Sequence, residues 1–495
     1  MSTKTAASTL GHPGAASEGE ITSFLRFLPV GAPLLLAGLF ILAQWQGVVA
    51  RLSTESTLVV LALISYISAA VFYVMLVLQK ETLLSNLATG AAALGFGLNI
   101  AAWGTRGLVA NHYPLSNLYD TALALGMTTA GASLVITTLG RHRFVGAFTL
   151  PIATLFIILA ILYGDQIIDM PPVLQSYWRP IHVSIAMTAY GVCALTFVLG
   201  LLYLLRDGMK TETLGLFVML LPLLTYAFLS GGSILTRGAF EIDLMIGGAR
   251  IPVNEAGTEF LRAQIPYVGE LFRAAFLGSL LTVLCFVGYL RRKQTRLQTY
   301  GHWFVRAVLL LQVVGLGALV YQMKTARVTS DLIVESQRSL IPPAWFEQFG
   351  SRLELLFRGN PVGLAGVFVA AAVTAFLVVF ALKRDRFMAT LPSLDVLDDL
   401  TYKGVTVAFP LLTLMTITGA VWANESWGRY WGWDPKETWA LITCICYAIF
   451  LHTRIVHGWR GRKTAMFAVI GFVAVIFTYL GVSFILPGLH SYATL

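Results

Sequence analysis

The sequence predicts an all-α, polytopic integral membrane protein with about thirteen transmembrane helices. Hydrophobic residues make up 57% of the 495 residues, charged residues make up only 12%, and the mean hydropathy is +0.75. Soluble domains carry roughly 25% charged residues, so no water-exposed fold would cover this much apolar surface. The apolar residues also fall into runs of about 20, the length at which a helix crosses a bilayer.

Each run is expected to be a helix, because a helix satisfies its own backbone hydrogen bonds in lipid. The thirteen runs cover residues 27–45, 57–79, 82–104, 117–139, 144–164, 181–205, 213–236, 269–290, 302–323, 361–383, 404–424, 439–454 and 464–486. The first is expected to be a retained helix, since the polar residues before it lack the compact pattern of a signal peptide.

Charge predicts the orientation, because Lys and Arg collect in the short loops on the cytoplasmic side of a membrane. With the N-terminus in the cytoplasm, the basic loops all fall inside, namely 141–143, 291–296, 383–386 and 454–463. The C-terminus then lies outside, together with five substantial segments: 105–116, 165–180, 237–268, 324–360 and 425–438. This bias accounts for the net charge of +9, so no nucleic-acid partner is implied.

The spans divide the chain into four parts. These are a cytoplasmic polar tail (1–26), N-terminal membrane helices that include the first external histidine segment (27–206), an inserted membrane region with two long outer loops (207–395), and a tryptophan-rich region with flanking helices (396–495). The sequence shows no internal repeat that would divide it further.

Tryptophan is concentrated in residues 422–439, which hold five of the eleven in the chain. Trp and Tyr commonly gather at membrane interfaces, but such a belt explains only one or two rings per helix end. The rings here alternate with charged residues such as Asp434, Lys436 and Glu437. A flat apolar platform beside fixed charges favours a large planar ligand with polar edges.

Three of the eight histidines lie where they could hold such a ligand. His182 stands at the outer end of one predicted helix and His490 follows the outer end of the last. His452 is 13 residues beyond Trp439, about 20 Å deeper in the membrane at 1.5 Å per residue. An intramembrane ionisable residue is a functional-site hypothesis by default, and neutral imidazole is a common haem ligand.

The stretch Trp427-Gly-Arg-Tyr-Trp-Gly-Trp-Asp-Pro-Lys-Glu-Thr-Trp439 resembles the "WWD" signature of haem-handling proteins. Its ending resembles the CcsA (ResC) branch, the synthase subunit of System II cytochrome c biogenesis. Further stretches resemble the same family, over roughly 55–205 and 395–495: Trp178-Arg-Pro-Ile-His182-Val-Ser, Leu451-His452-Thr-Arg454, Gly488-Leu-His490-Ser-Tyr492, and His112-Tyr-Pro-Leu-Ser-Asn-Leu-Tyr119, whose role is less clear.

The resemblance implies a cytochrome c biogenesis protein that conducts haem b across the membrane and presents it, reduced, at the outer face. There its vinyl groups are joined to the thiols of a CxxCH apocytochrome c, so the chain would be a subunit of a holocytochrome c synthase. His182 and His490 would be axial ligands of the outer haem and His452 of an inner haem. The platform of the outer haem would comprise Trp427, Trp431, Trp433 and Asp434.

The resemblance also implies a partner, because the second ligand of the inner haem normally comes from a CcsB (ResB)-like membrane subunit. His302, in the inserted region, is the alternative within this chain. The region 207–395 departs from the compact form of the family, and its role is open between structural support and docking of the apocytochrome or partner. The expected location is the bacterial plasma membrane with a periplasmic active face, since no transit-like leader precedes the first span.

Two other functions are open: a haem exporter or carrier without lyase activity, and a b-type cytochrome that passes electrons. A b-type cytochrome would have paired histidines on facing helices across both halves of the membrane and no outer aromatic platform. The platform therefore argues against it. The lyase and the carrier share every sequence feature, so only covalent attachment of haem to an acceptor separates them.

Overall fold

The computed structural model describes residues 27–47, 54–78, 81–140, 142–164, 167, 175–228, 232–247, 249–253, 259–325, 328–356, 360–482 and 486. Its α-helices are α2 (Leu28–Trp45), α3 (Thr54–Leu78), α4 (Thr82–Ala110), α5 (Leu118–Leu134), α6 (Gly146–Tyr163), α7 (Trp178–Arg206), α8 (Thr211–Phe228), α9 (Ser233–Arg237), α10 (Val268–Arg292), α11 (Thr295–Thr325), α12 (Glu335–Arg338), α13 (Pro343–Phe349), α14 (Pro361–Thr390), α15 (Leu394–Trp427), α16 (Pro435–Val456) and α17 (Arg462–Ile476). The strands are β1 (Phe240–Asp243), β2 (Met245–Ile246), β3 (Ala249–Arg250) and β4 (Arg262–Ile265).

The prediction of an all-α polytopic membrane protein is confirmed. Among the described residues, twelve helices are long and apolar enough to cross a membrane, and each coincides with one of the thirteen predicted runs. The remaining run, predicted over 213–236, contains α8, a shorter apolar helix. The N-terminal tail 1–26 and His490 lie outside the described residues.

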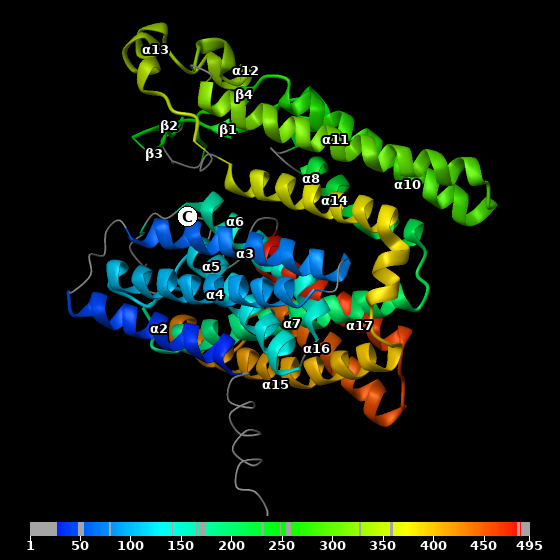
Figure 1. Cartoon of the computed structure of the whole chain (residues 1–495). Helices are drawn as coiled ribbons and strands as arrows, with labels where there is room; N and C mark the ends of the chain where they lie inside the picture. The colour runs from blue at the N-terminus through cyan, green and yellow to red at the C-terminus, as the bar shows by residue number, and fades with distance from the viewer. Residues whose placement is uncertain are drawn as a thin grey trace, which may run out of the picture.

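The helices form two layers, and the helix axes of both layers are roughly parallel (Figure 1). One layer contains α2–α7 and α15–α17, and the other contains α8, α10, α11 and α14. Helix α14 joins the layers, because it packs on α8 and α11 on one side and on α6 and α3 on the other. Its backbone leaves helical geometry at Lys383 (φ −121°, ψ 18°), where the yellow helix bends towards α15 (Figure 1).

Helix α7 lies at the centre of the first layer. It packs on α5, α15 and α17, and its buried residues follow one another almost without interruption from Ala186 to Leu205. A helix that is apolar on all sides is typical of a position surrounded by other helices. The first turns of α7 are therefore held in a fixed position relative to α5 and α15.

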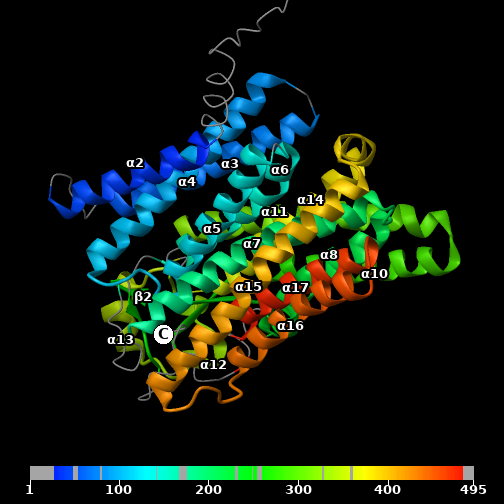
Figure 2. The same cartoon turned by 90° about the horizontal axis from the view of Figure 1, so that it is seen from below.

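Alternating helix directions bring the Trp-rich segment to one end of the bundle, which we call the Trp end and define by residues 427–435. Helices α7 and α16 begin at this end and α15 ends there, and Ser176 donates a hydrogen bond to Glu425 across it (2.9 Å). Seen from below, α12, α13 and β2 lie at the same end (Figure 2). The opposite end carries ion pairs such as Arg454–Asp398 (2.6 Å) and Arg462–Asp207 (2.8 Å).

The two long loops of the inserted region form one small ordered unit at the Trp end. Strands β1 and β4 pair antiparallel, with Phe240 opposite Ile265. The second loop joins them through a bridge between Ala263 and Ile333. An ion pair between Arg262 and Glu241 (2.7 Å) also links β4 to β1. The described parts of both loops are thus structured, as is common for connections of this length.

Candidate functional site

A cavity of about 160 Å³ lies at the Trp end, between α5, α7, α15, α16 and the π-helical turn Phe477–Gly481. Much of its lining is apolar: Val183, Ala186, Met187, Met415, Ala420 and Ala423. Other lining residues are aromatic, polar or charged and include Asn117, Arg179, His182, Trp422, Tyr430, Trp431, Lys436 and Glu437. A mainly apolar pocket with a few convergent polar groups is the usual form of a small-molecule site.

His182 presents its imidazole to this cavity in a defined orientation. Its Nδ1 lies 2.9 Å from the carbonyl oxygen of Met415 on α15, and 3.5 Å from the hydroxyl of Thr418. A carbonyl oxygen only accepts hydrogen bonds, so Nδ1 carries the proton in this bond. Nε2 is then the basic nitrogen, which is the arrangement found in metal-ligating histidines.

Gly419 makes room for this imidazole on α15. A Cβ at position 419 would lie 2.7 Å from Cε1 of His182 and 3.0 Å from Nδ1. Both distances are too short for a carbon atom, so any larger residue would displace the ring. The absence of a side chain at Gly419 therefore fixes how close α7 and α15 come at the cavity.

The tryptophan rings form two contacting groups. Trp422 is 4% exposed and its ring centroid lies 5.7 Å from that of His182. Trp427 packs on Trp422 (5.6 Å), and Trp433 meets Trp431 edge to face (5.8 Å, 88°). Of these four, Trp422 and Trp431 line the cavity, and Trp427 and Trp433 stand one ring behind them. Trp433 is 70% exposed.

The turn between α15 and α16 is held by carboxylates. One oxygen of Glu437 accepts hydrogen bonds from the backbone N–H groups of Gly432 (2.8 Å) and Asp434 (3.2 Å). Asp434 caps α16 by accepting from the N–H of Lys436 (3.1 Å), completing a capping box with Glu437. Trp433 has φ +57°, which costs a non-glycine residue about 1 kcal/mol. The hydrogen bonds of Glu437 and Asp434 hold the turn, and with it Trp433, in this conformation.

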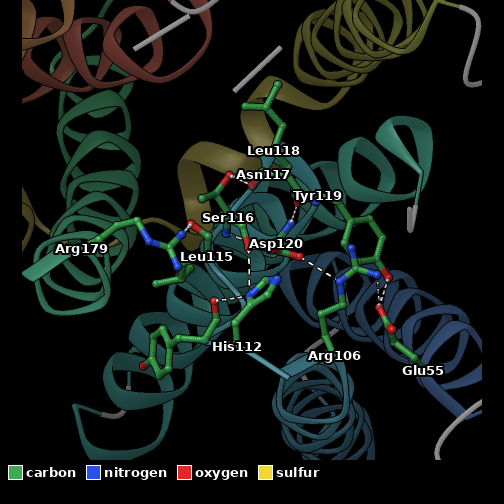
Figure 3. A network of polar contacts seen from close by, with 12 residues as sticks. Glu55, Arg106, His112, Leu115, Ser116, Asn117, Leu118, Tyr119, Asp120 and Arg179 are labelled. Carbon is green, nitrogen blue, oxygen red and sulfur yellow. Dashed lines mark hydrogen bonds and ion pairs between the residues drawn. The ribbon is translucent and has the colours of Figure 1, made fainter. Parts of the chain in front are cut away.

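A buried ion network supports another wall of the cavity (Figure 3). Arg106 pairs with Asp120 (3.0 Å) and lies 3.7 Å from Glu55. Tyr119 donates to the same Glu55 carboxylate (2.8 Å). The second oxygen of Asp120 accepts from the backbone N–H of Ser116 (2.9 Å). Arg106 and Asp120 are 2% and 1% exposed, so each is compensated by the other inside the protein.

This network fixes the segment 112–120, which contains the family-like stretch of less clear role, His112–Tyr119. Leu115, Ser116 and Asn117 of this segment line the cavity. Ser116 also contacts the imidazole of His112 (3.2 Å), and Asn117 caps α5 by accepting from the N–H of Asp120 (2.9 Å). The stretch therefore shapes the cavity wall through buried polar contacts.

Of the three predicted axial histidines, His182 and His452 belong to the described part of the chain, and His490 lies outside it. His182 lies at the cavity, whereas His452 is exposed on the last turns of α16, roughly 26 Å from Pro435 along the helix. The His452 ring lies 5.5 Å from that of His457. The alternative inner residue, His302, belongs to α11 in the other layer, where its Nε2 lies 3.3 Å from a carboxylate oxygen of Glu212.

Several cavity residues were not among the predicted site residues: Arg179, Trp422, Tyr430, Lys436 and Glu437. A signal for most of them was present, since Arg179 stands one turn before His182 in the same motif and the other four lie within residues 422–439. Gly419 and the pairing of Arg106 with Asp120 had no such signal, because they depend on which helix faces are in contact.

Comparison with known proteins identifies relatives. The family model described as "Cytochrome C assembly protein" matches residues 115–239 and 362–490. The protein named cytochrome c biogenesis protein CcsA from Gloeobacter violaceus is 28% identical over 440 residues, covering 87% of this chain and 93% of the relative. The CcsA protein from Trichormus variabilis is 30% identical over 82% of this chain and 88% of its own length. The CcsA protein from a Synechococcus strain is 30% identical over 92% of this chain and 97% of its own length.

The comparisons also describe the inserted region. The two matched segments of the family model leave out 240–361, which hold strands β1–β4 and helices α10–α13. The alignment with the Synechococcus protein covers 92% of this chain.

Proposed function

This chain belongs to the CcsA family of cytochrome c assembly proteins, and from that premise we propose that it carries haem b through the membrane and presents it to apocytochrome c. Its role in cytochrome c biogenesis follows from the family. The finer proposal is that the chain is a subunit of a holocytochrome c synthase, in which reduced haem at the Trp end is joined to a CxxCH acceptor.

The observation that carries the proposal is the position of His182 in the Trp-end cavity. Nδ1 lies 2.9 Å from the Met415 carbonyl, and in the neutral tautomer that donates this hydrogen bond the lone pair that iron requires is on Nε2. Trp422 and Trp431 supply aromatic walls to the same cavity. An imidazole beside aromatic and apolar walls suits a flat, largely apolar metalloporphyrin. We propose His490 as the second axial ligand and Trp427, Trp433 and Asp434 as support for the site.

Thioether formation would require little from the chain beyond positioning of the haem. A thioether forms when the S–H of an acceptor cysteine adds across a haem vinyl group, with sulfur bonding to one carbon and the proton going to the other. No electrons are gained or lost in this step, and the acceptor supplies the nucleophile. His182 would hold the iron in place, and the walls of the cavity would exclude water from the bound haem.

We propose that the Trp end faces the periplasm and that the chain lies in the bacterial plasma membrane, with its N-terminus in the cytoplasm and its C-terminus outside. Support comes from the basic residues at the opposite end of the bundle: Arg206, Arg384, Lys403, Arg454 and Arg462. Such residues are enriched on the cytoplasmic side of membranes.

Reconstitution with an acceptor tests the proposed function. The full chain is expressed with a CcsB-like subunit and a CxxCH apocytochrome in a bacterium that lacks its own maturation system. We expect haem that stays on the acceptor through denaturing electrophoresis, and none without the chain. Haem that accumulates at the outer face but remains extractable would favour the exporter or carrier function instead.

A separate prediction concerns the inner haem. His452 is exposed on α16, which would leave it open to a second subunit, whereas His302 is occupied by Glu212 (3.3 Å). We therefore expect His452→Ala to lower haem per protein and His302→Ala to leave it unchanged, with inner loading weak until a CcsB-like partner is co-expressed. Pyridine haemochrome assays of each variant, with and without the partner, measure this.

Equal losses for His302→Ala and His452→Ala, with no effect of the partner, would contradict this assignment of the inner ligands. His457→Ala is the matched control, because the His457 ring lies 5.5 Å from His452 at the same helix end. A loss confined to His452→Ala distinguishes a ligand from a general effect on this end of α16.

A further inference from the structure

One exposed face of α11 carries charged, aromatic and aliphatic side chains in a regular order. From the start of the helix, at the end of the bundle opposite the Trp end, the order is a cation, two aromatic rings, a second cation and then aliphatic residues: Arg296, Tyr300, Trp303, Arg306, Leu310 and Val313. We call this set the α11 stripe. Residues three or four apart lie on the same side of a helix, so these side chains share one face.

A strongly basic turn precedes this face. The turn between α10 and α11, residues 291–296, contains three arginines and one lysine, and the end of this helix pair projects beyond the neighbouring helices (Figure 1, Figure 2). Within the described part of the chain, the side chains of Arg291, Arg292, Lys293 and Arg296 form neither an ion pair nor a hydrogen bond. Their positive charge is thus directed to the surroundings of this end of the bundle.

Acidic side chains of the described helices do not neutralise this charge. Helix α11 contains no Asp or Glu, and the acidic residue of α10, Glu270, belongs to its first turn at the other end. The carboxylate of Glu212 on α8 is 5% exposed and accepts from Gln298 (2.7 Å), which lies on a different face of α11. Asp385 on α14 follows the bend at Lys383, which turns that helix towards α15 (Figure 1).

Arg306 lies inside the predicted span and is nevertheless exposed. It stands about 16 Å beyond the start of α11, and its guanidinium carbon lies 5.5 Å from the centroid of the Trp303 ring, one turn closer to the basic turn. A lipid-facing arginine extends towards the headgroups because its charge is costly in hydrocarbon, and Trp and Tyr are enriched at the same level. Arg306 and Trp303 thus mark the headgroup level on this face, with the aliphatic part of the stripe beneath them.

We propose that the α11 stripe binds an anionic phospholipid. The lipid phosphate pairs with the guanidinium of Arg306 beside the Trp303 ring, and the acyl chains lie along Leu310 and Val313. A guanidinium offers a phosphate two parallel N–H donors. The basic turn 291–296 selects lipids of net negative charge, as clusters of Lys and Arg beside a membrane helix do.

A lipid matches this face better than a second protein does, because the order of the side chains follows one leaflet of a bilayer. The basic turn corresponds to the charged surface, the aromatic rings and Arg306 to the headgroups, and Leu310 and Val313 to the hydrocarbon. The site belongs to the inserted region and lies at the end of the bundle opposite the Trp-end cavity. The proposal therefore does not depend on haem binding.

The experiment measures the Kd of the first lipid bound by the delipidated full-length chain, using native mass spectrometry. Phosphatidylglycerol is the anionic probe, and phosphatidylcholine with the same acyl chains is the zwitterionic one. We expect the unmodified chain to bind phosphatidylglycerol at least tenfold more tightly, since each basic residue near a membrane surface strengthens the attraction of anionic lipids about fivefold.

Substitutions separate Arg306 from the basic turn. Arg306→Gln is expected to weaken phosphatidylglycerol binding about fivefold, and Arg306→Lys to retain part of the affinity. Neutralising the turn with glutamine at positions 291, 292, 293 and 296 is expected to remove the preference over phosphatidylcholine. Lys324→Gln is the matched control and should leave the Kd unchanged. Lys324 is an exposed cation at the other end of the same helix, three residues after the exposed Tyr321, and has no basic cluster beside it.

Brominated lipids test the location of the site. Bromine on an acyl chain close to the headgroup quenches the fluorescence of a neighbouring tryptophan. The difference in quenching between the unmodified chain and Trp303→Phe is the contribution of Trp303. We expect brominated phosphatidylglycerol to quench Trp303 more strongly than brominated phosphatidylcholine at the same mole fraction.

Three results would overturn the proposal. The first is an equal Kd for the two lipids in the unmodified chain, and the second is undiminished phosphatidylglycerol binding by folded Arg306→Gln. The third is a co-expressed CcsB-like subunit that no longer co-purifies with the Arg306 and turn variants while their lipid binding is unchanged, which would assign the face to a protein contact. If Arg306→Gln does not fold, Arg306→Lys and the turn variant decide, because the turn lies outside the predicted spans.

Discussion

His182→Ala should abolish holocytochrome formation, and added imidazole should restore part of it. The substitution removes the nitrogen that the Met415 carbonyl orients towards the cavity and leaves the surrounding helices in place. Because the missing element would be a single axial ligand, a small imidazole can occupy the space of the lost ring. The measurement is the yield of covalently bound haem on a CxxCH acceptor, with and without imidazole, beside the Soret spectrum of the purified chain.

Gly419→Ala is the companion variant, because it keeps His182 but adds a Cβ 2.7 Å from its Cε1. The ring has to move, so we expect a partial loss of haem retention and a smaller rescue by imidazole. Gly317→Ala is a matched control, since a Cβ at Gly317 on α11 would meet no atom within 4 Å. Normal cytochrome maturation in His182→Ala would contradict the assignment of His182 as a ligand.

Asp120→Leu should destabilise the membrane domain more than any substitution of an exposed charge. Asp120 pairs with Arg106 at 3.0 Å and both side chains are almost fully buried. Removing Asp120 leaves the buried Arg106 with the more distant Glu55 (3.7 Å), and breaking a buried pair typically costs up to about 3–5 kcal/mol. The loss should appear as a lower Tm and a lower yield of detergent-soluble protein, and as weaker haem binding because segment 112–120 lines the cavity.

Asp399→Leu is the control for this second prediction. Asp399 pairs with Lys403 at 2.7 Å, but the two side chains are 53% and 68% exposed, and such surface pairs contribute about 0–1 kcal/mol. We expect little change in Tm. If Asp120→Leu behaves in the same way as Asp399→Leu, the buried network is not what holds segment 112–120 in place.

The sequence predicted the helices well because membrane spans are a property of composition and length. Any run of about 20 apolar residues has to be helical in lipid, and within the described part of the chain twelve of the thirteen predicted runs contain helices of spanning length. The run over 213–236 differs, because its helix α8 ends at Phe228. A short helix α9 follows from Ser233, and a hydropathy window does not resolve this division.

The candidate site was predicted less completely. The motif around His182 and the dense tryptophans indicated the right end of the bundle, because the direction of the chain alternates with each span. The sequence did not show that Trp422 and Trp431 line the cavity in front of Trp427 and Trp433. That distinction depends on the rotation of each helix about its axis, which is set by neighbours far away in the chain.

The amino-acid sequence by itself thus determined the class of protein, the order of its membrane helices along the chain, and the residues that share the Trp end. Only the tertiary structure decided which of those residues meet. Asp434 caps a helix, His302 contacts Glu212, and Arg106 finds Asp120. The physical reason is that local hydrophobicity fixes where a helix forms, whereas contacts inside a bundle depend on close packing between helices and on the pairing of buried charges.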